Sequence, residues 1–335
     1  MVLIGMLRRY KKPMIKDAVA AMFAKEHQAE VIFFTADKID FKRKLIYGCK
    51  YKYGTWVEEV SYFPDVVYND IPLRKDEPIY ERLKQEGIPF TTHRLGKNKM
   101  EFQEAMAKNP YLSKYIIETI PYNSVETLRK LLDKHKTVFL KPNKGHKGLG
   151  IQIFEKTKDG IHIRDAVGLD KEILDSYLES IKDINYYHFQ PGIHSVTPQG
   201  NPFIIRSYVG RNGKGNWINF FHYAAISNNK NKIVNVSVGS SMSYITPFLE
   251  SMYEEEEAKK VKSNLNTVTI EIAKQTQKLV TPMIDALGLD LGINQNGDIH
   301  IIEINAFPAT RPFEAGVEKL AIPYALYLAK NHQNS

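Results

Sequence analysis

The chain has 335 residues, with 46 Lys and Arg against 38 Asp and Glu, so its formal net charge is +8. Apolar residues make up 43% and charged residues 25%, which excludes a disordered chain, a collagen and a coiled coil. The length predicts two or three domains and is ample for a buried core without metal or disulfide staples.

A single cysteine, Cys49, excludes an internal disulfide framework and a cysteine-rich zinc site, and it fits a reducing compartment. No apolar run approaches the ~20 residues of a transmembrane helix. The apolar start, Met1–Leu7, precedes its basic residues, whereas a signal peptide has the opposite order. We therefore expect a cytoplasmic protein without a membrane segment.

The first 50 residues hold most of the positive charge, with 11 Lys and Arg against 5 Asp and Glu. Such a segment either binds nucleic acid, a membrane or an acidic substrate, or is a solvated basic surface. The segment has no interleaved aromatic pattern and no known nucleic-acid motif, which favours the second interpretation. The pattern leaves the oligomeric state open.

Residues 1–95 have the pattern of a small α/β unit, in which strands alternate with helices and a parallel sheet is expected. The expected elements are strands at Val2–Met6 and Ala29–Thr35, a helix at Ile15–Lys25, an apolar run at Ser61–Tyr68 and a helix at Glu77–Gly87.

Residues 96–185 change in texture. Asn123 and Glu126 resemble a capping box for a helix that turns Leu128 and Leu132 inward. A small sheet follows, in which a glycine-bearing loop separates two neighbouring strands. Its expected strands are Thr137–Lys141, Ile151–Glu155 and Ile161–Ile163.

Strands dominate after residue 185. The expected elements are strands at Tyr186–Gln190, Pro202–Val209, Trp217–Ile226 and Ile233–Val238, a long helix whose apolar steps run from Val261 to Met283, and a hairpin at Leu289–Ile304. Pro282 is expected to kink the last turn of that helix.

The hairpin carries two carboxylates and an amide. If Asn296 and Gly297 form a two-residue turn, paired positions sum to 593, so Asp290 faces Glu303 and Asn305 shares their side of the sheet. Directly opposed like charges destabilise a strand pair, whereas a bound cation reverses that sign. Mg²⁺ uses one or two carboxylates together with phosphate oxygens. The hairpin is therefore either a magnesium site or a solvated acidic edge, with its other face (Leu289, Leu291, Ile293, Ile302 and Ile304) on the core.

The second chemical signal is the glycine loop at 143–150. It lacks the Gly-Lys-Ser/Thr ending of a Walker loop, and a strand rather than a helix follows it, unlike a dinucleotide fingerprint. Its glycines let backbone N–H groups approach phosphates, and Lys141, Lys144 and Lys147 add positive charge. The alternative is an ordinary glycine-rich hairpin.

A glycine loop between antiparallel strands, followed by an Asp…Glu-x-Asn hairpin, resembles the ATP-grasp superfamily. The stretches that extend this likeness over nearly the whole chain are Ile4-Gly5-Met6-Leu7, Pro64–Asn69, Ile117-Glu118-Thr119, Phe139–Pro142 and Ile302–Asn305. They are similar to the YheC/YheD-like group, described as endospore coat-associated. The resemblance implies an α/β plus α+β fold, with a preATP-grasp domain at 1–95, an ATP-grasp N-terminal subdomain at 96–185 and a C-terminal subdomain at 186–335.

The resemblance implies an ATP-dependent carboxylate–amine ligase that works through an acylphosphate, with ATP and one or two Mg²⁺ as cofactors. Its substrates are a small-molecule or peptide carboxylate and a nucleophilic acceptor, and its location is cytoplasmic with spore association. The implied catalytic residues are Lys141 and Arg206, although Arg206 could instead be a structural arginine, and the implied metal ligands are Asp290, Glu303 and Asn305. Arg311, six residues beyond Asn305, is expected either to act in catalysis by binding the substrate carboxylate in a bidentate fork or to be a salt-bridge partner in a loop. The implied nucleotide contacts are Lys99, Lys141, Lys144, Gly145, Lys147, Gly148, Gly150, Phe189, Gln190 and Asn235, with Gly239 beside them.

The sequence departs from the family pattern at two points. Ile204 stands where many members have Asp two residues before the arginine, and the strand that often carries a second arginine reads His222–Ile226. His222 is either a compensating general base or a structural histidine. These departures indicate either an unusual substrate or a degenerate spore-associated interaction protein. A kinase of the same fold that phosphorylates a small-molecule acceptor is a further alternative.

Overall fold

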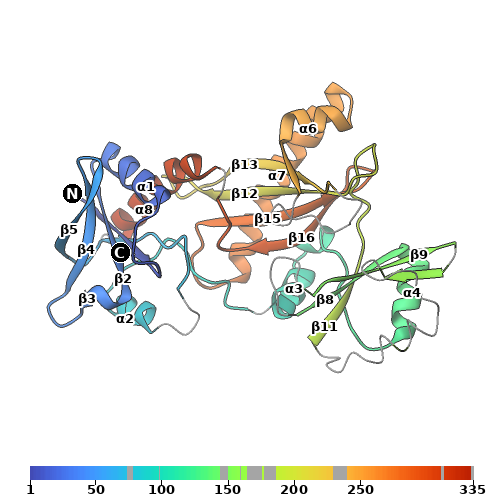
Figure 1. Cartoon of the computed structure of the whole chain (residues 1–335), viewed down its shortest axis with the longest axis horizontal. Helices are drawn as coiled ribbons and strands as arrows, with labels where there is room; N and C mark the ends of the chain where they lie inside the picture. The colour runs from blue at the N-terminus through green and yellow to red at the C-terminus, as the bar shows by residue number, and fades with distance from the viewer. Residues whose placement is uncertain are drawn as a thin grey trace.

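The computed structural model describes residues 1–73, 78–97, 99–143, 150–158, 160–163, 176, 186–228, 240–310 and 313–332. Three β-sheets follow one another along the long axis of the molecule (Figure 1). The sheet of the N-terminal residues lies at one end, and the sheet that contains β12–β16 lies in the middle. No helix in these ranges is long and apolar enough to cross a membrane.

The N-terminal sheet is mixed rather than purely parallel, which corrects the sequence expectation. Its strands are β1 (Leu3–Arg8), β2 (Glu30–Thr35), β3 (Ile39–Asp40), β4 (Leu45–Lys52), β5 (Thr55–Tyr62) and β6 (Val66–Val67). Only β2, β1 and β6 run parallel, and β4 pairs antiparallel with β2, β3 and β5. The unpredicted β4–β5 hairpin turns at Tyr53 and Gly54, both with positive φ, as a two-residue hairpin turn requires.

The C-terminal helix packs on the N-terminal unit. Helices α1 (Ile15–Glu26) and α8 (Glu314–His332) lie side by side next to this sheet, whereas α2 (Ile79–Gln85) lies apart from them (Figure 1). Small side chains on both helices allow a close approach, among them Ala20 and Ala24 of α1 and Ala325 of α8. The two ends of the chain therefore share one core.

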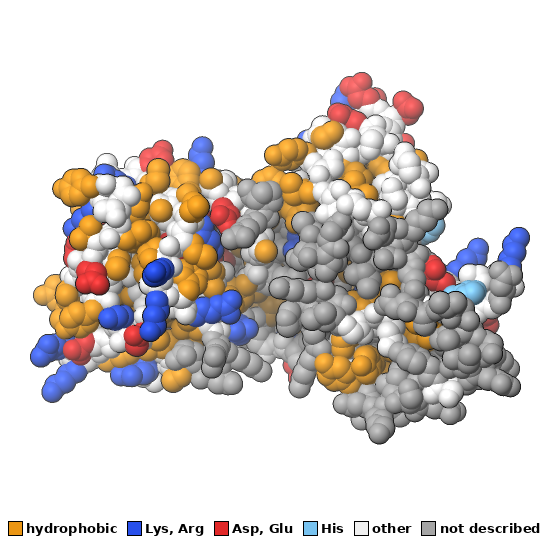
Figure 2. Space-filling model, in the orientation of Figure 1, with side chains coloured by type: hydrophobic (Ala, Val, Ile, Leu, Met, Phe, Trp, Pro, Cys, Tyr) orange, Lys and Arg blue, Asp and Glu red, His pale blue; other side chains and the backbone are white. Residues whose placement is uncertain are grey.

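Hydrophobic side chains are exposed on the surface of the N-terminal unit (Figure 2). On β4, β5 and the turn between them, the exposed residues include Tyr47, Tyr53, Val60 and Tyr62.

The second sheet is antiparallel throughout. Its strands are β7 (Ile120–Pro121), β8 (Thr137–Pro142), β9 (Gln152–Thr157), β10 (Gly160–Ile163) and β11 (Tyr187–Pro191), in the order β10-β9-β8-β11-β7. Helix α3 (Lys99–Lys108) precedes it, and α4 (Val125–His135) packs on it through Leu128 and Leu132. The cap of α4 is Ser124, whose Oγ accepts the Thr127 N–H at 3.2 Å, and not the expected Asn123.

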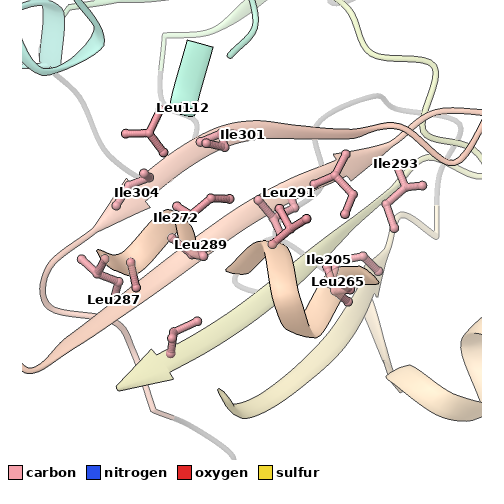
Figure 3. Packing of buried hydrophobic residues seen from close by; sticks show 14 of the residues in the cluster. Leu112, Ile205, Leu265, Ile272, Leu287, Leu289, Leu291, Ile293, Ile301 and Ile304 are labelled. Atoms are coloured by element: carbon pink, nitrogen blue, oxygen red, sulfur yellow. The ribbon is translucent and has the colours of Figure 1, made fainter. Parts of the chain in front are cut away.

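The third sheet is also antiparallel. Its strands are β12 (Phe203–Arg211), β13 (Trp217–Ile226), β14 (Ser241–Tyr244), β15 (Ala286–Ile293) and β16 (Ile299–Asn305), in the order β14-β13-β12-β15-β16. One face packs on α7 (Glu255–Leu279), where Leu265 and Ile272 meet Ile205, Leu289 and Leu291 (Figure 3). Helix α6 (Ile245–Met252) precedes α7.

Two further sequence expectations concern this part of the chain. Helix α7 stops at Leu279, before Pro282, and Met283 is exposed, so no kinked last turn forms. The residue before a proline disfavours helical geometry, which accounts for the early end. The strand expected at Ile233–Val238 lies outside the described residues.

Candidate active site

The third sheet brings three ionisable side chains into one row across its strands. Arg206 of β12 lies opposite Asp290 of β15, and Asp290 lies opposite Glu303 of β16. Directly opposed residues in antiparallel strands share one face of the sheet. The core residues Ile205, Leu289 and Ile304 alternate with them and face α7. The row therefore lies on the face turned away from the main core.

Arg206 and Asp290 form a two-point ion pair. The Arg206 NH2 group donates to Asp290 Oδ2 at 2.7 Å, and its Nε contacts Oδ1. Burial raises the pKa of Asp290 to about 6, Arg206 opposes that rise, and the neighbouring charge of Glu303 adds to it. The pKa of Asp290 stays high in spite of the ion pair, because desolvation outweighs the attraction of Arg206. A further cation beside these carboxylates would lower this electrostatic cost.

The donor set fits a hard cation. Asp290, Glu303 and Asn305 offer oxygen ligands only, from two adjacent strands. Among the residues that the structure describes, no group of three or more His, Cys, Asp or Glu side chains is arranged to hold a metal. Mg²⁺ commonly binds to one or two carboxylates and takes its other ligands from water and phosphates, so two carboxylates and an amide suffice. A cation between Asp290 and Glu303 would displace at least one of the Arg206 contacts.

The opposition of Asp290 and Glu303 was predicted, but the hairpin reaches it by a different route. Asn294 N–H bonds to Asp298 O at 3.1 Å, and Gly297 has a φ of +79°, so the turn is a three-residue loop. The expected two-residue turn and the pairing of Gln295 with Asp298 are therefore wrong.

A β-bulge then restores the predicted register. Leu291 pairs with Ile301 while Asp290 pairs with Glu303, so Ile302 is the extra residue. Ile301, rather than the expected Ile302, consequently faces the core. The longer loop shifts the register by one residue and the bulge shifts it back, so Asp290 and Glu303 lie opposite each other as predicted.

The glycine loop joins β8 to β9, and its residues 144–149 lie outside the described residues. The expectations for Lys144, Gly145, Lys147 and Gly148 are therefore untested. Gly150, at the end of the loop, has a φ of +75°, a conformation that favours glycine. Of the loop residues predicted to contact the nucleotide, Gly150 alone lies within the described ranges.

Lys141 and Gln190 meet on neighbouring strands. The Lys141 Nζ donates to Gln190 Oε1 and lies 5.3 Å from the centre of the Phe139 ring. Gln190 is buried and its Nε2 also donates to Thr119 Oγ1 at 3.4 Å. Phe189 is fully buried in the core of the second sheet, and its strand is paired on both sides, with β8 at Leu140 and with β7 at Ile120. A nucleotide contact of Phe189 therefore stays a prediction.

The remaining predicted residues are only partly placed. Lys99 is the first residue of α3, and Asn235, Gly239 and Arg311 lie outside the described residues. His222 is structural in its contacts. Its Nδ1 lies 2.7 Å from Ser207 Oγ and its Nε2 lies 2.8 Å from Asn266 Oδ1, and burial lowers its pKa to about 4. Ser207 is fully buried, so these three residues are no nucleophilic site.

Sequence reasoning missed two features of the structure. The first is a group of aromatic rings beside Arg206, formed by Tyr223, Tyr244 and Phe313. The second is a buried charge cluster between α1, β6 and α8, which contains Arg8, Lys16, Asp17, Asp70 and Glu318. The first could have been found by extending the strand pairing of Arg206 to β13. No local pattern signals the second.

Two kinds of sequence comparison place the chain among known proteins. The family model for YheC/D-like ATP-grasp proteins matches residues 87–328. Endospore coat-associated protein YheD of Bacillus subtilis (strain 168) is 25% identical over 321 residues, which cover 89% of this chain and 70% of that protein. Endospore coat-associated protein YheC of the same strain is 23% identical over 271 residues, which cover 77% of this chain and 74% of that protein.

Solved structures show the same fold at low identity. The D-alanine-D-alanine ligase from Coxiella burnetii superposes with a TM-score of 0.53 at 13% identity, covering 100% of this chain and 97% of that one. Biotin carboxylase from Campylobacter jejuni gives 0.54 at 13% identity, covering 96% and 71%. Together with the family match, these similarities confirm the predicted α/β plus α+β ATP-grasp fold.

Proposed function

Because this chain belongs to the YheC/D-like ATP-grasp family, we propose that it is an ATP-dependent ligase that joins a carboxylate to an amine. The observation that supports the proposal is the row of Arg206, Asp290 and Glu303 on one face of the third sheet. It combines a delocalised cation with a pair of carboxylates, which is the chemistry that phosphoryl transfer from ATP needs.

The reaction we propose has two steps. A substrate carboxylate oxygen attacks the γ-phosphorus of ATP, the bond from that phosphorus to the bridging oxygen breaks, and ADP leaves. The amine nitrogen then attacks the acyl carbon of the acylphosphate and loses a proton, and inorganic phosphate departs. The protein contributes positioning and electrostatics rather than covalent chemistry.

Each placed residue receives a role in this scheme. Asp290, Glu303 and Asn305 would hold Mg²⁺, which neutralises charge on the phosphates when bound. Arg206, already aimed at this point by Asp290, would stabilise the transferred phosphoryl group. Lys141, on the strand that leads into the glycine loop, would contact the phosphates after leaving Gln190.

The test of this proposal is thermal unfolding with and without Mg²⁺–ADP. Binding at about 100 times the dissociation constant stabilises a fold by about 2.7 kcal/mol. We expect a clear rise in Tm for the wild type and a much smaller rise for Glu303→Gln, because that variant lacks one metal-ligand charge. Glu257→Gln, which changes an exposed carboxylate at the start of α7, is the matched control and keeps the full rise. A full rise in Glu303→Gln contradicts the metal assignment.

A second candidate function is favoured by the relatives' names. Both curated relatives are endospore coat-associated proteins, so we also propose spore association for this chain. If the protein is spore-associated, the site either catalyses the ligase reaction at the spore or has lost that activity and serves as a binding scaffold. Absence of any Mg²⁺–ADP response in the wild type favours the scaffold. A response with ADP release but no amide product favours a kinase.

A further inference from the structure

The row that contains Arg206 continues across β13 and β14 as aromatic residues. Tyr223 lies opposite Arg206, and Tyr244 lies opposite Tyr223. Neighbouring strands are about 4.8 Å apart, so the two tyrosines start about 5 and about 10 Å from Arg206 along the row. One side of the ion pair is therefore acidic and the other is aromatic.

A third ring covers these two from another segment. Phe313 lies just before α8, where its N–H bonds to Thr310 O and its carbonyl accepts the Val317 N–H. Its ring centre lies 5.8 Å from that of Tyr223 and 6.0 Å from that of Tyr244. It also stacks on Phe221 at 4.2 Å, which fixes its plane. Two strands and the start of a helix thus supply one group of rings.

These rings are not part of the main core. The core of the third sheet lies on the α7 side and contains Ile205 and Ala224, whereas Tyr223 alternates with Ala224 and faces the other way. Tyr244 is 64% exposed, while Tyr223 is 8% exposed beneath it. Burial raises the pKa of Tyr223, and the charge of Arg206 opposes that rise. The ring of Tyr244 is therefore open to a ligand beside Arg206, while Tyr223 and the partly buried Phe313 supply the ring faces next to it.

We propose that Tyr223, Tyr244 and Phe313 form a subsite for an aromatic side chain of the carboxylate substrate. This inference rests on the proposed ligase function and specifies its substrate class. The carboxylate that attacks the phosphoryl group stabilised by Arg206 lies beside that residue. A ring two or three bonds away then lies about 5 Å along the row, where Tyr223 and Phe313 begin. The substrate is thus an aromatic amino acid or a peptide that ends in one. Offset and edge-to-face contacts with the rings would select it.

The experiment measures carboxylate activation without needing the natural amine. Hydroxylamine replaces the amine, attacks the acylphosphate at its acyl carbon and yields a hydroxamate and phosphate. The wild type is supplied with Mg²⁺–ATP, hydroxylamine, and phenylalanine, tyrosine, alanine or aspartate, each free and as the last residue of a dipeptide. We expect kcat/KM for the aromatic carboxylates to exceed that for alanine by about tenfold or more.

Two variants test the location of the subsite. Tyr244→Ala and Phe313→Ala should each reduce the preference for aromatic over alanine carboxylates about tenfold, through KM. Both should keep the Tm rise with Mg²⁺–ADP. The matched control is Tyr62→Ala, which removes a 79% exposed tyrosine from β5 of the N-terminal sheet and should keep the full preference.

Two results would overturn the inference alone, and two others would overturn the proposed function on which it rests. Equal or greater activation of alanine or aspartate by a wild type that responds to ADP contradicts the aromatic subsite. Loss of the ADP response in Tyr244→Ala or Phe313→Ala shows that the rings bind the nucleotide base instead. An ADP response without any hydroxamate removes carboxylate activation. Absence of the ADP response in the wild type contradicts the proposed function itself.

Discussion

At the scale of single residues, the ion pair of Arg206 and Asp290 governs the candidate site. The carboxylate is almost fully buried and the guanidinium about three-quarters buried, and two contacts join them. Removal of one partner from a buried pair leaves an uncompensated charge, which is more harmful than removal of both. The effect of this ion pair on the free energy of unfolding can therefore be measured in the absence of any nucleotide.

We predict that Arg206→Met lowers the free energy of unfolding by about 2–3 kcal/mol at neutral pH, because Asp290 then stays buried without its partner. Asp290→Asn in the same background should recover most of that loss. Urea unfolding of the wild type, both single variants and the double variant gives the coupling energy directly. Additive losses in the double variant would show that the two side chains do not stabilise each other.

At the scale of elements, the sequence predicts strands and pairings better than turns. The apolar alternation of Leu289, Leu291 and Ile304 identified the hairpin, and Asn296-Gly297 located its end. The loop length and the bulge at Ile302 are not predicted, because Asn-Gly also suits a two-residue turn and no local pattern marks a bulge. In the structure Ile301 N–H bonds to Tyr115 O, a residue far away in the sequence. The predicted pairing of Asp290 with Glu303 is nevertheless correct, because the longer loop and the bulge shift the register by one residue in opposite directions. Local propensity does not encode this compensation.

Other elements were missed for comparable reasons. The β4–β5 hairpin has weak alternation with exposed apolar and charged residues on both faces, so no clean period marks it. The cap of α4 shifted by one residue, because Ser124 and Asn123 are both good caps and only the observed backbone decides between them. The ion pair itself depends on strand order, β12 beside β15, which the sequence does not state.

Gly288 shows how the hairpin accommodates the segment that follows it. It lies opposite Asn305, and a Cβ added there would come 2.8 Å from the Cβ of Pro308. We predict that Gly288→Ala lowers the free energy of unfolding by about 1–3 kcal/mol and weakens the Mg²⁺–ADP response, since Pro308, three residues beyond Asn305, must shift.

The control for this prediction is Gly316→Ala. Gly316 lies inside α8 with no atom near its added Cβ, so alanine should stabilise the helix by about 0.5–1 kcal/mol and leave the ADP response unchanged. Denaturant unfolding of both variants measures the change in the free energy of unfolding, and thermal shifts with Mg²⁺–ADP measure the nucleotide response. A stable Gly288→Ala protein with a normal ADP response would show that the close approach is unimportant.

At the scale of the whole molecule, α8 joins the N-terminal sheet to the third sheet through a buried charge cluster. Glu318 is fully buried on α8, within a network of ionisable groups from the elements around it. These groups are Arg8 at the end of β1, Lys16 and Asp17 of α1, Tyr68 and Asp70 after β6, Tyr208 of β12 and Asp285 before β15. Between the N-terminal sheet and α8, the two cations Arg8 and Lys16 face the three carboxylates Asp17, Asp70 and Glu318, so a protonated Glu318 balances these charges. The fourth carboxylate of the network, Asp285, lies on the side of the third sheet, and burial raises its pKa to about 6.

This arrangement predicts a pH dependence of stability. Burial raises the pKa of Glu318 to about 8, with Asp70 adding to the rise and Lys16 opposing it. The folded state therefore binds a proton that the unfolded state releases near pH 4.5. The stabilisation is complete below that pH and is lost as the pH rises towards 8. Glu318→Gln mimics the protonated form, so the variant should match the wild type near pH 5.

At pH 9 we expect Glu318→Gln to exceed the wild type in its free energy of unfolding by on the order of 3 kcal/mol. Urea unfolding at several pH values between 5 and 9 measures the difference between the two proteins, which removes the contribution of all other titrating groups. Glu257→Gln, an exposed carboxylate on α7, should show a difference from the wild type that does not change over this range. If the difference for Glu318→Gln is equally constant, Glu318 is ionised in the fold, and Arg8 and Lys16 must then stabilise three carboxylates between the N-terminal sheet and α8.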